Sequence, residues 1–102
     1  ALLTARANAD ACAPILGVLT LVVYRAPTGV RARIEDVVVD ESARGQGVAS
    51  ALVVRALEFA REKGADGVAL TSSPRREAAN KLYQKVGFKR WETNVYFYKF
   101  DE

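Results

Sequence analysis

The stretch that decides the fold is Arg44-Gly45-Gln46-Gly47-Val48-Ala49. It lies between an apolar strand pattern at residues 34–40 and a helix pattern at residues 48–63. The first N–H groups of a helix have no intrahelical partner, and the helix dipole favours negative charge beside them. The two glycines let the backbone approach a phosphate closely, and Arg44 adds a positive charge with fork geometry. The turn therefore predicts a site for a phosphorylated ligand.

The rest of the chain predicts seven further elements around this turn and its helix. Apolar spacing and turn residues distinguish strands from helices, and Gly64 and Gly87 are natural helix stops. The expected elements are strands at 2–7, 15–25 and 30–40, a helix at 48–63, a strand at 68–71, a helix with Ser73 as its N-cap and Gly87 at its end, and closing strands at 88–92 and 95–100. Residues 8–13 are rich in turn formers, and Thr93 and Asn94 are expected to join the last two strands.

This order, β-β-β-α-β-α-β-β, predicts a single α/β (α+β) domain that spans residues 1–102. A strand, a long helix and another strand in succession imply a crossover to a parallel neighbour, whereas the remaining connections favour antiparallel pairing. The sheet should therefore be mixed and mostly antiparallel. The run Val37-Val38-Val39 is apolar on both faces, which is typical of a central strand covered on both sides.

Composition narrows the classes of partner. The net charge of +3 suits a small anion as well as nucleic acid, but the arginines are dispersed and no nucleic-acid motif is present, so we expect no nucleic-acid partner. No apolar run approaches the roughly 20 residues that span a bilayer, so we expect no membrane segment. The chain has no histidine and one cysteine, Cys12, so we expect no metal site, no intrachain disulfide and a cytoplasmic location.

Two motifs resemble those of one enzyme family. The apolar strand followed by Arg44, two residues, Gly47 and then Ala49 resembles the R/Q-x-x-G-x-G/A signature of the GNAT acyl-CoA N-acyltransferase superfamily. A second set resembles that family's second motif and contains Asn80, Leu82, Tyr83, Gly87 and Phe88. The resemblance covers residues 34–88 in the family's order. It implies a GNAT-like fold with a central splay, and an N-acetyltransferase that moves an acetyl group from acetyl-CoA directly to a small-molecule or protein amine.

The resemblance also implies how acetyl-CoA binds as cosubstrate. Its pyrophosphate would lie on the N–H groups of the loop and helix start, and its pantetheine arm along the strand before them. The implied residues are Val37, Val38, Val39, Arg44, Gly45, Gln46, Gly47, Val48, Ala49, Ser50 and Asn80. The valines are equally compatible with a core role, and Asn80 with an exposed helix position. Arg75 and Arg76 either reach the adenosine phosphate or form a solvated charged face.

Tyr83 and Glu35 are the candidate catalytic residues. Tyr83 stands where the family often places the acid that protonates the departing thiolate, and phenols and thiols have similar pKa values. Glu35 resembles a base that polyamine acetyltransferases carry at the same spacing, and its segment resembles that of glucosamine-6-phosphate acetyltransferases. The alternatives are a half-buried aromatic for Tyr83, and an ion pair with Arg31 or Arg33 for Glu35. Strand alternation predicts Asp36 on the opposite face from Glu35.

The chain departs from the family at its start. Most members carry helices before the first strands, and these usually form one wall of the acceptor pocket. We expect those N-terminal helices to be missing here, so that an upstream segment or a partner subunit completes the acceptor half. Exposed apolar surface would then favour a homodimer. The alternative function is a catalytically silent CoA-binding regulatory or interaction module.

Overall fold

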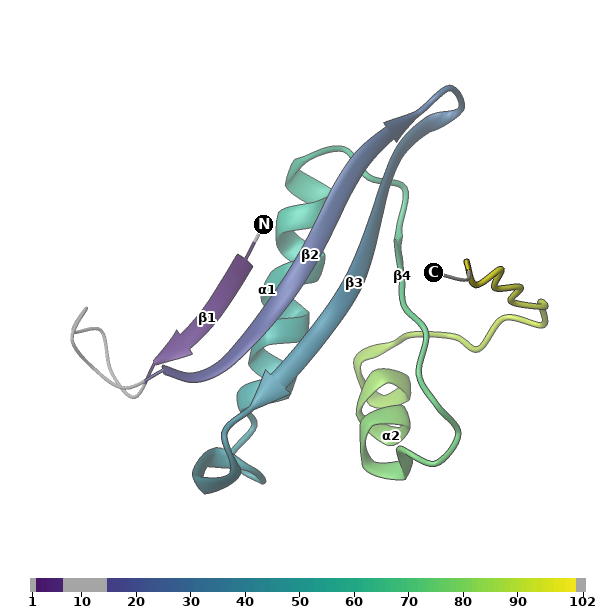
Figure 1. The fold of residues 1–102 in the computed structure, drawn as a ribbon. Helices are drawn as coiled ribbons and strands as arrows, with labels where there is room; N and C mark the ends of the chain where they lie inside the picture. Colours follow the sequence, from purple (N-terminus) through teal and green to yellow (C-terminus); the bar gives the residue numbers. More distant parts are fainter. Residues whose placement is uncertain (1, 7–14, 101–102) are drawn as a thin grey trace.

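A four-stranded sheet with two helices forms the domain in the computed structural model, which describes residues 2–6 and 15–100 (Figure 1). The strands lie in the order β1 (Leu2–Arg6), β2 (Ile15–Ala26), β3 (Gly29–Val39) and β4 (Val68–Ala69). The first three pair antiparallel and β4 runs parallel to β3, which confirms the mixed, mostly antiparallel sheet. The turn expected at residues 8–13, with Cys12, lies outside the described residues.

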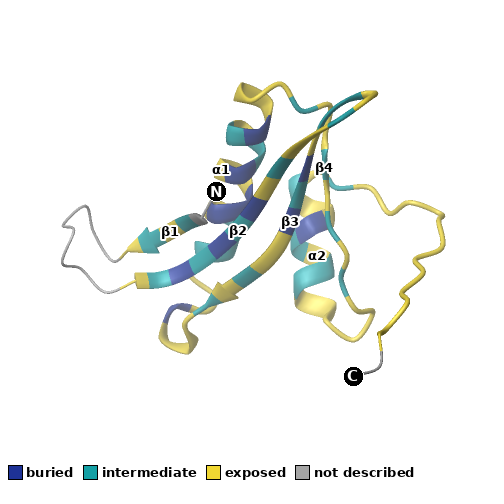
Figure 2. Ribbon diagram, turned by 45° about the horizontal axis from the view of Figure 1, so that its top comes forward, coloured by how far each residue is buried: buried dark blue, intermediate teal, exposed yellow. Residues whose placement is uncertain are grey.

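Strand β2 supplies the centre of the buried face. Leu19 and Leu21 are fully buried, while Thr20 between them points to the other face, as the period of two in a strand requires. Ala32 and Ile34 on β3 continue this buried row. One face of the antiparallel pair β2 and β3 therefore forms one side of the hydrophobic core (Figure 2).

Helix α1 (Val48–Glu62) packs across β2 and β3 and confirms the predicted helix to within one residue. Its buried side chains recur at helical spacing and are Leu52, Val53, Ala56 and Ala60. On its exposed side Arg55 pairs with Glu58 at 3.9 Å and with Glu62 at 3.6 Å. Within the described ranges, neither this helix nor any other is long and apolar enough to cross a bilayer.

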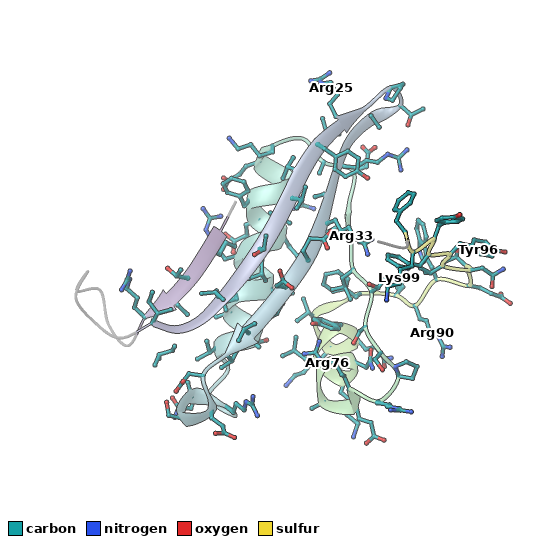
Figure 3. All side chains as sticks on the ribbon, in the orientation of Figure 1. Arg25, Arg33, Arg76, Arg90, Tyr96 and Lys99 are labelled. Atoms are coloured by element: carbon teal, nitrogen blue, oxygen red, sulfur yellow. The ribbon has the colours of Figure 1, made fainter. Side chains whose placement is uncertain are left out.

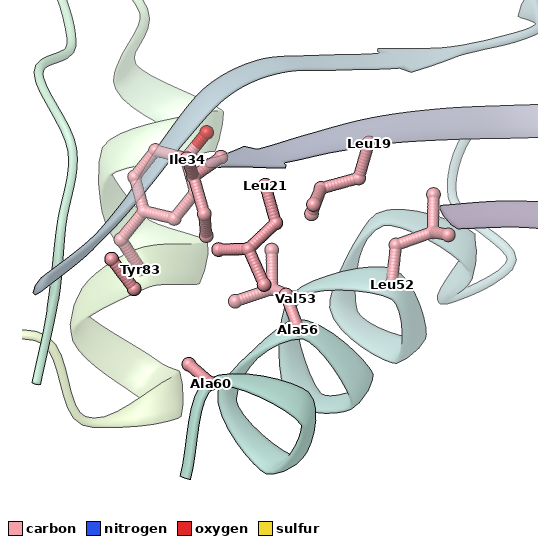
Figure 4. Packing of buried hydrophobic residues seen from close by; sticks show 9 residues of the cluster. Leu19, Leu21, Ile34, Leu52, Val53, Ala56, Ala60 and Tyr83 are labelled. Carbon is pink, nitrogen blue, oxygen red and sulfur yellow. The ribbon is translucent and has the colours of Figure 1, made fainter. Parts of the chain in front are cut away.

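Helix α2 (Glu77–Val86) completes the core through Tyr83, whose ring reaches from the helix toward β3 beside Ile34 (Figure 4). The predicted stop is confirmed, because the N–H of Gly87 donates to the Tyr83 carbonyl at 3.2 Å. The prediction of Ser73 as N-cap is wrong. The carbonyl of Ser73 accepts from the N–H of Arg76 at 3.0 Å and closes a turn, so the helix begins only at Glu77.

The two closing strands predicted at 88–92 and 95–100 are also wrong. Residues 88–100 form no strand, and after Phe88 the chain extends away from the sheet and helices (Figure 1). Trp91 and Tyr96 are 82% and 88% exposed. A strand needs a neighbouring edge over its whole length, and β4, the nearest edge strand, has only two residues. Alternating apolar residues thus predicted a strand for which this chain offers no matching edge.

Candidate functional site

A cavity of about 630 Å³ lies between the end of β3, the start of α1 and helix α2, where β3 continues beyond its short pairing with β4. The two strands pair only at Ala32 with Val68 and at Arg33 with Ala69, whereas β3 continues to Val39. The edge of β3 beyond Arg33 therefore has no neighbouring strand on the side of β4. This space, the β3–β4 cavity, is lined by Val37, Val38, Val39, Arg44, Ala49, Arg75, Arg76, Glu77, Ala78, Ala79, Leu82 and Tyr83.

The start of α1 presents open hydrogen-bond donors at this cavity. Gly45 and Gly47 have φ of +81° and +76°, a conformation that glycine adopts without steric cost. Gly47 is the N-cap and offers no side chain to the first turn. Among the described residues, the backbone N–H groups of Val48, Ala49 and Ser50 find no acceptor. Three aligned, unpaired N–H groups beside Arg44 form a site for an anion.

A short 3₁₀ helix, η1 (Glu41–Ala43), braces the loop that leads to α1. The Asp40 carboxylate accepts from the hydroxyl and the backbone N–H of Ser42, and these bonds hold the pKa of Asp40 below its ordinary value. The side chain of Gln46 donates to the Ser42 carbonyl at 3.3 Å. Gln46 is therefore placed to support the loop through its side chain.

The approach of α1 to the sheet depends on Gly17 of β2, a residue that sequence reasoning did not single out. A Cβ at this position would stand 3.0 Å from Cγ1 of Val48 and 3.1 Å from the carbonyl oxygen of Val38. A larger residue would require Val48, Leu52 or the backbone at Val38 to move by a few tenths of an ångström, so glycine favours this close approach of α1 to β2 and β3. The signal in the sequence was a single glycine inside an apolar strand, which is typical of a close backbone approach.

Tyr83 lines the cavity and Asn80 does not. Tyr83 is 8% exposed, and its ring meets that of Phe88 edge-on at 5.9 Å between centroids. Its hydroxyl has no hydrogen-bond partner in the described part of the chain. The side-chain amide of Asn80 instead donates to the carbonyls of Ser73 and Arg76, both at 2.9 Å. Asn80 thus fixes the loop before α2.

Glu35 lies on β3 but outside the lining of the cavity. A β-bulge makes it the unpaired residue, because Ile34 faces Leu21 and Asp36 faces Thr20. The prediction that Asp36 lies on the opposite face from Glu35 is wrong. Ile34 and Val37 both face the core, and the two carboxylates between them are exposed on the outer face. Oε1 of Glu35 lies 3.0 Å from Nε of Arg33, so the ion pair considered for it is present.

Among the described residues, no three histidine, cysteine or carboxylate side chains lie close enough together to hold a metal ion.

The sequence profile of the Acetyltransferase (GNAT) family matches residues 2–88. The chain belongs to this family. The acetyltransferases of this family use acetyl-CoA as cosubstrate.

Individual relatives agree with this assignment. Human N-acetyltransferase 8B is 48% identical over 52 residues, which are 51% of this chain and 23% of that protein. Glucosamine 6-phosphate N-acetyltransferase of Trypanosoma brucei brucei is 44% identical over 62 residues, which are 61% of this chain and 40% of that protein. The crystal structure of a Trypanosoma brucei acetyltransferase is 31% identical, with a TM-score of 0.77, and covers 96% of this chain and 69% of that one. This GNAT chain spans less than half the length of the curated relatives it matches.

Proposed function

We propose that this GNAT domain transfers an acetyl group from acetyl-CoA directly to an amine. The observation that carries the proposal is the β3–β4 cavity. Residues of both sequence motifs, Arg44 and Ala49 of the first and Tyr83 of the second, line it together with the three valines of β3. Segments about 40 residues apart in the sequence thus meet around one space, next to unpaired N–H groups that suit a phosphate.

The donor would bind along two surfaces of the cavity. Its pyrophosphate would accept from the N–H groups of Val48, Ala49 and Ser50 and pair with Arg44. Its pantetheine arm carries two amides and would add to the open edge of β3 at residues 37–39 like an extra strand. That mode uses the valine backbone, so Val37 can pack against the core at the same time.

The reaction would bring acceptor and donor together from the two faces of the sheet. The amine nitrogen attacks the thioester carbonyl carbon while the C–S bond breaks. Glu35, on the outer face, takes the proton from the amine, and Tyr83, on the helical side, gives a proton to the departing thiolate. A backbone N–H near Val38 would stabilise the oxyanion.

The outer face indicates a cationic acceptor. The bulge exposes Glu35 and Asp36 on that face, and two carboxylates attract an ammonium group. A test panel therefore contains a diamine and a peptide with a free N-terminus. It also contains glucosamine 6-phosphate, because a relative bears the name of that reaction.

The release of CoA thiol from acetyl-CoA, measured with each amine of the panel, tests the function. We expect amine-dependent release that stops in the absence of acceptor. Acetyl-CoA binding without turnover on any amine would contradict catalysis and support the silent CoA-binding module. No binding of acetyl-CoA would overturn both.

We also propose that the chain forms a homodimer through residues 95–100. Val95, Phe97 and Tyr98 are 74–87% exposed, and this strand-like apolar segment finds no edge of matching length within its own chain. Pairing with the same segment of a second copy would satisfy its backbone and cover its apolar side chains. Light scattering should show a dimer, and Phe97→Pro, which removes a ladder N–H, should give a monomer. A monomeric wild type would contradict the proposal.

The cytoplasmic location stays a prediction from the sequence.

A further inference from the structure

A second positive wall lines the β3–β4 cavity together with Arg44. Arg75 and Arg76, from the loop between β4 and α2, line the same cavity, and Arg76 lies on the side of α2 toward β3 (Figure 3). None of the three arginines forms an ion pair with another described residue. Glu77 is the single carboxylate in the lining. Two separate segments therefore bring uncompensated positive charge to one space.

The second wall is held in place by Asn80. Its side-chain amide donates to the carbonyls of Ser73 and Arg76 at 2.9 Å each, and the Ser73 carbonyl also accepts from the N–H of Arg76 at 3.0 Å. The hydroxyl of Ser73 accepts from the N–H of Arg75 at 3.3 Å. The loop that carries both arginines is therefore tied at its two ends to one side chain. Such ties reduce the entropy that the loop would lose when its arginines bind a ligand.

The donor carries one more phosphate group than the proposed site at the start of α1 accounts for. CoA carries a diphosphate and, on its ribose, a separate 3′-phosphate. The proposed function assigns the diphosphate to the N–H groups of α1 and to Arg44, and it leaves the 3′-phosphate without a partner. Arginine binds phosphate with two parallel hydrogen bonds, which is stronger and more directional than contact with a neutral donor.

We propose that Arg75 and Arg76 form a subsite for the 3′-phosphate of CoA, and that Asn80 is the positioning residue of this subsite. The inference rests on the proposed function, because it requires the diphosphate at the start of α1. It predicts selectivity between two ligands that differ in one phosphate only.

Calorimetric titration of the intact chain with CoA and with 3′-dephospho-CoA tests the subsite. We expect the wild type to bind CoA at least about tenfold more tightly. In the double variant Arg75→Ala/Arg76→Ala the two affinities should become equal, with that of 3′-dephospho-CoA unchanged. Arg61→Ala removes one charge from the last turn of α1, away from the cavity, and should keep the wild-type preference.

The variant Asn80→Leu tests the positioning role without a change of charge. A disordered loop should lower the affinity for CoA severalfold and leave that for 3′-dephospho-CoA unchanged, whereas general destabilisation would lower both. Equal wild-type affinities for the two ligands, or equal losses of both in the double variant, would overturn the subsite. If the wild type binds neither ligand, the proposed function fails and the subsite fails with it.

Discussion

Gly17 and Val48 touch across the interface between β2 and α1, so closely that a Cβ on residue 17 would stand 3.0 Å from Cγ1 of Val48. The carbonyl oxygen of Val38 would be 3.1 Å away on the other side. This contact sets the first turn of α1 next to the end of β3. The open N–H groups and the valine edge therefore share one cavity.

Gly17→Ala should lower stability and donor affinity together. The new methyl group meets backbone on one side and a β-branched side chain on the other, and overpacking of this kind costs about 1–3 kcal/mol. To relieve this overpacking, the start of α1 would move away from β3. The N–H groups and the β3 edge would then no longer fit one CoA molecule, so CoA would bind more weakly. Gly67→Ala is the matched control, because its Cβ meets nothing within 4 Å. Melting curves and CoA titration report both effects, and a Gly17→Ala protein with wild-type affinity would contradict the argument.

Gly47→Ala separates backbone strain from ligand binding. Alanine at a φ of +76° is strained by about 1–2 kcal/mol, so the loop should rotate and turn the N–H groups of α1 away from the ligand. Gly64→Ala carries the same strain, at a φ of +84°, beyond the other end of α1. Both variants should lose similar stability in a melting experiment, but only Gly47→Ala should lose CoA affinity. Equal CoA affinities in the two variants would show that the N–H groups at the start of α1 do not bind the anion.

The parts of the fold that the sequence predicts are those with local signals. Helix α1 begins beside two glycines and ends beside a third, and its apolar spacing is regular, so its bounds were predicted to within one residue. The hairpin of β2 and β3 was predicted equally well, because its turn and its apolar strands lie close together in the chain.

The features that the sequence did not predict depend on partners distant in the chain. The bulge at Glu35 arises from the register between β2 and β3, which strand alternation alone does not specify. The tail at 95–100 has a strand pattern, but whether a strand forms depends on a free edge elsewhere. The bonds from the Asn80 amide to the carbonyls of Ser73 and Arg76 are local, but they arise from a loop conformation before α2 that the sequence pattern does not specify. The contact of Asn80 with the cofactor stays a prediction.

Ser72→Ala should stabilise the free protein and Ser73→Ala should destabilise it. The hydroxyl of Ser72 is buried and has no hydrogen-bond partner among the described residues, and burial of an unpaired polar group costs about 1–3 kcal/mol. The hydroxyl of Ser73 accepts from the N–H of Arg75. Thermal melting should give a higher melting temperature for Ser72→Ala than for the wild type, and a lower one for Ser73→Ala. A lower melting temperature for Ser72→Ala would show that its hydroxyl is satisfied.

Tyr83→Phe should lower kcat and leave the fold unchanged. The phenyl ring keeps its edge-on contact with Phe88, so only the proton donor is lost. General acid catalysis contributes roughly 10²–10⁴-fold, so we expect a loss of about 100-fold in kcat with KM for acetyl-CoA unchanged. Tyr24→Phe, on an exposed part of β2, is the control. A decrease confined to KM would instead assign Tyr83 to binding.

Glu35→Gln should lower kcat/KM for the amine by roughly 10²-fold at neutral pH, because the acceptor then loses its proton only to water. The variant depends on amine that is already neutral in solution, so its rate should keep rising at alkaline pH where that of the wild type levels off. The lost ion pair with Arg33 is exposed and is worth at most about 1 kcal/mol, so the fold should persist. Asp36→Asn is the matched control on the same face of the bulge and should reduce the rate far less. Equal losses in the two variants, with pH profiles parallel to that of the wild type, would mean that both carboxylates attract the acceptor and neither takes its proton.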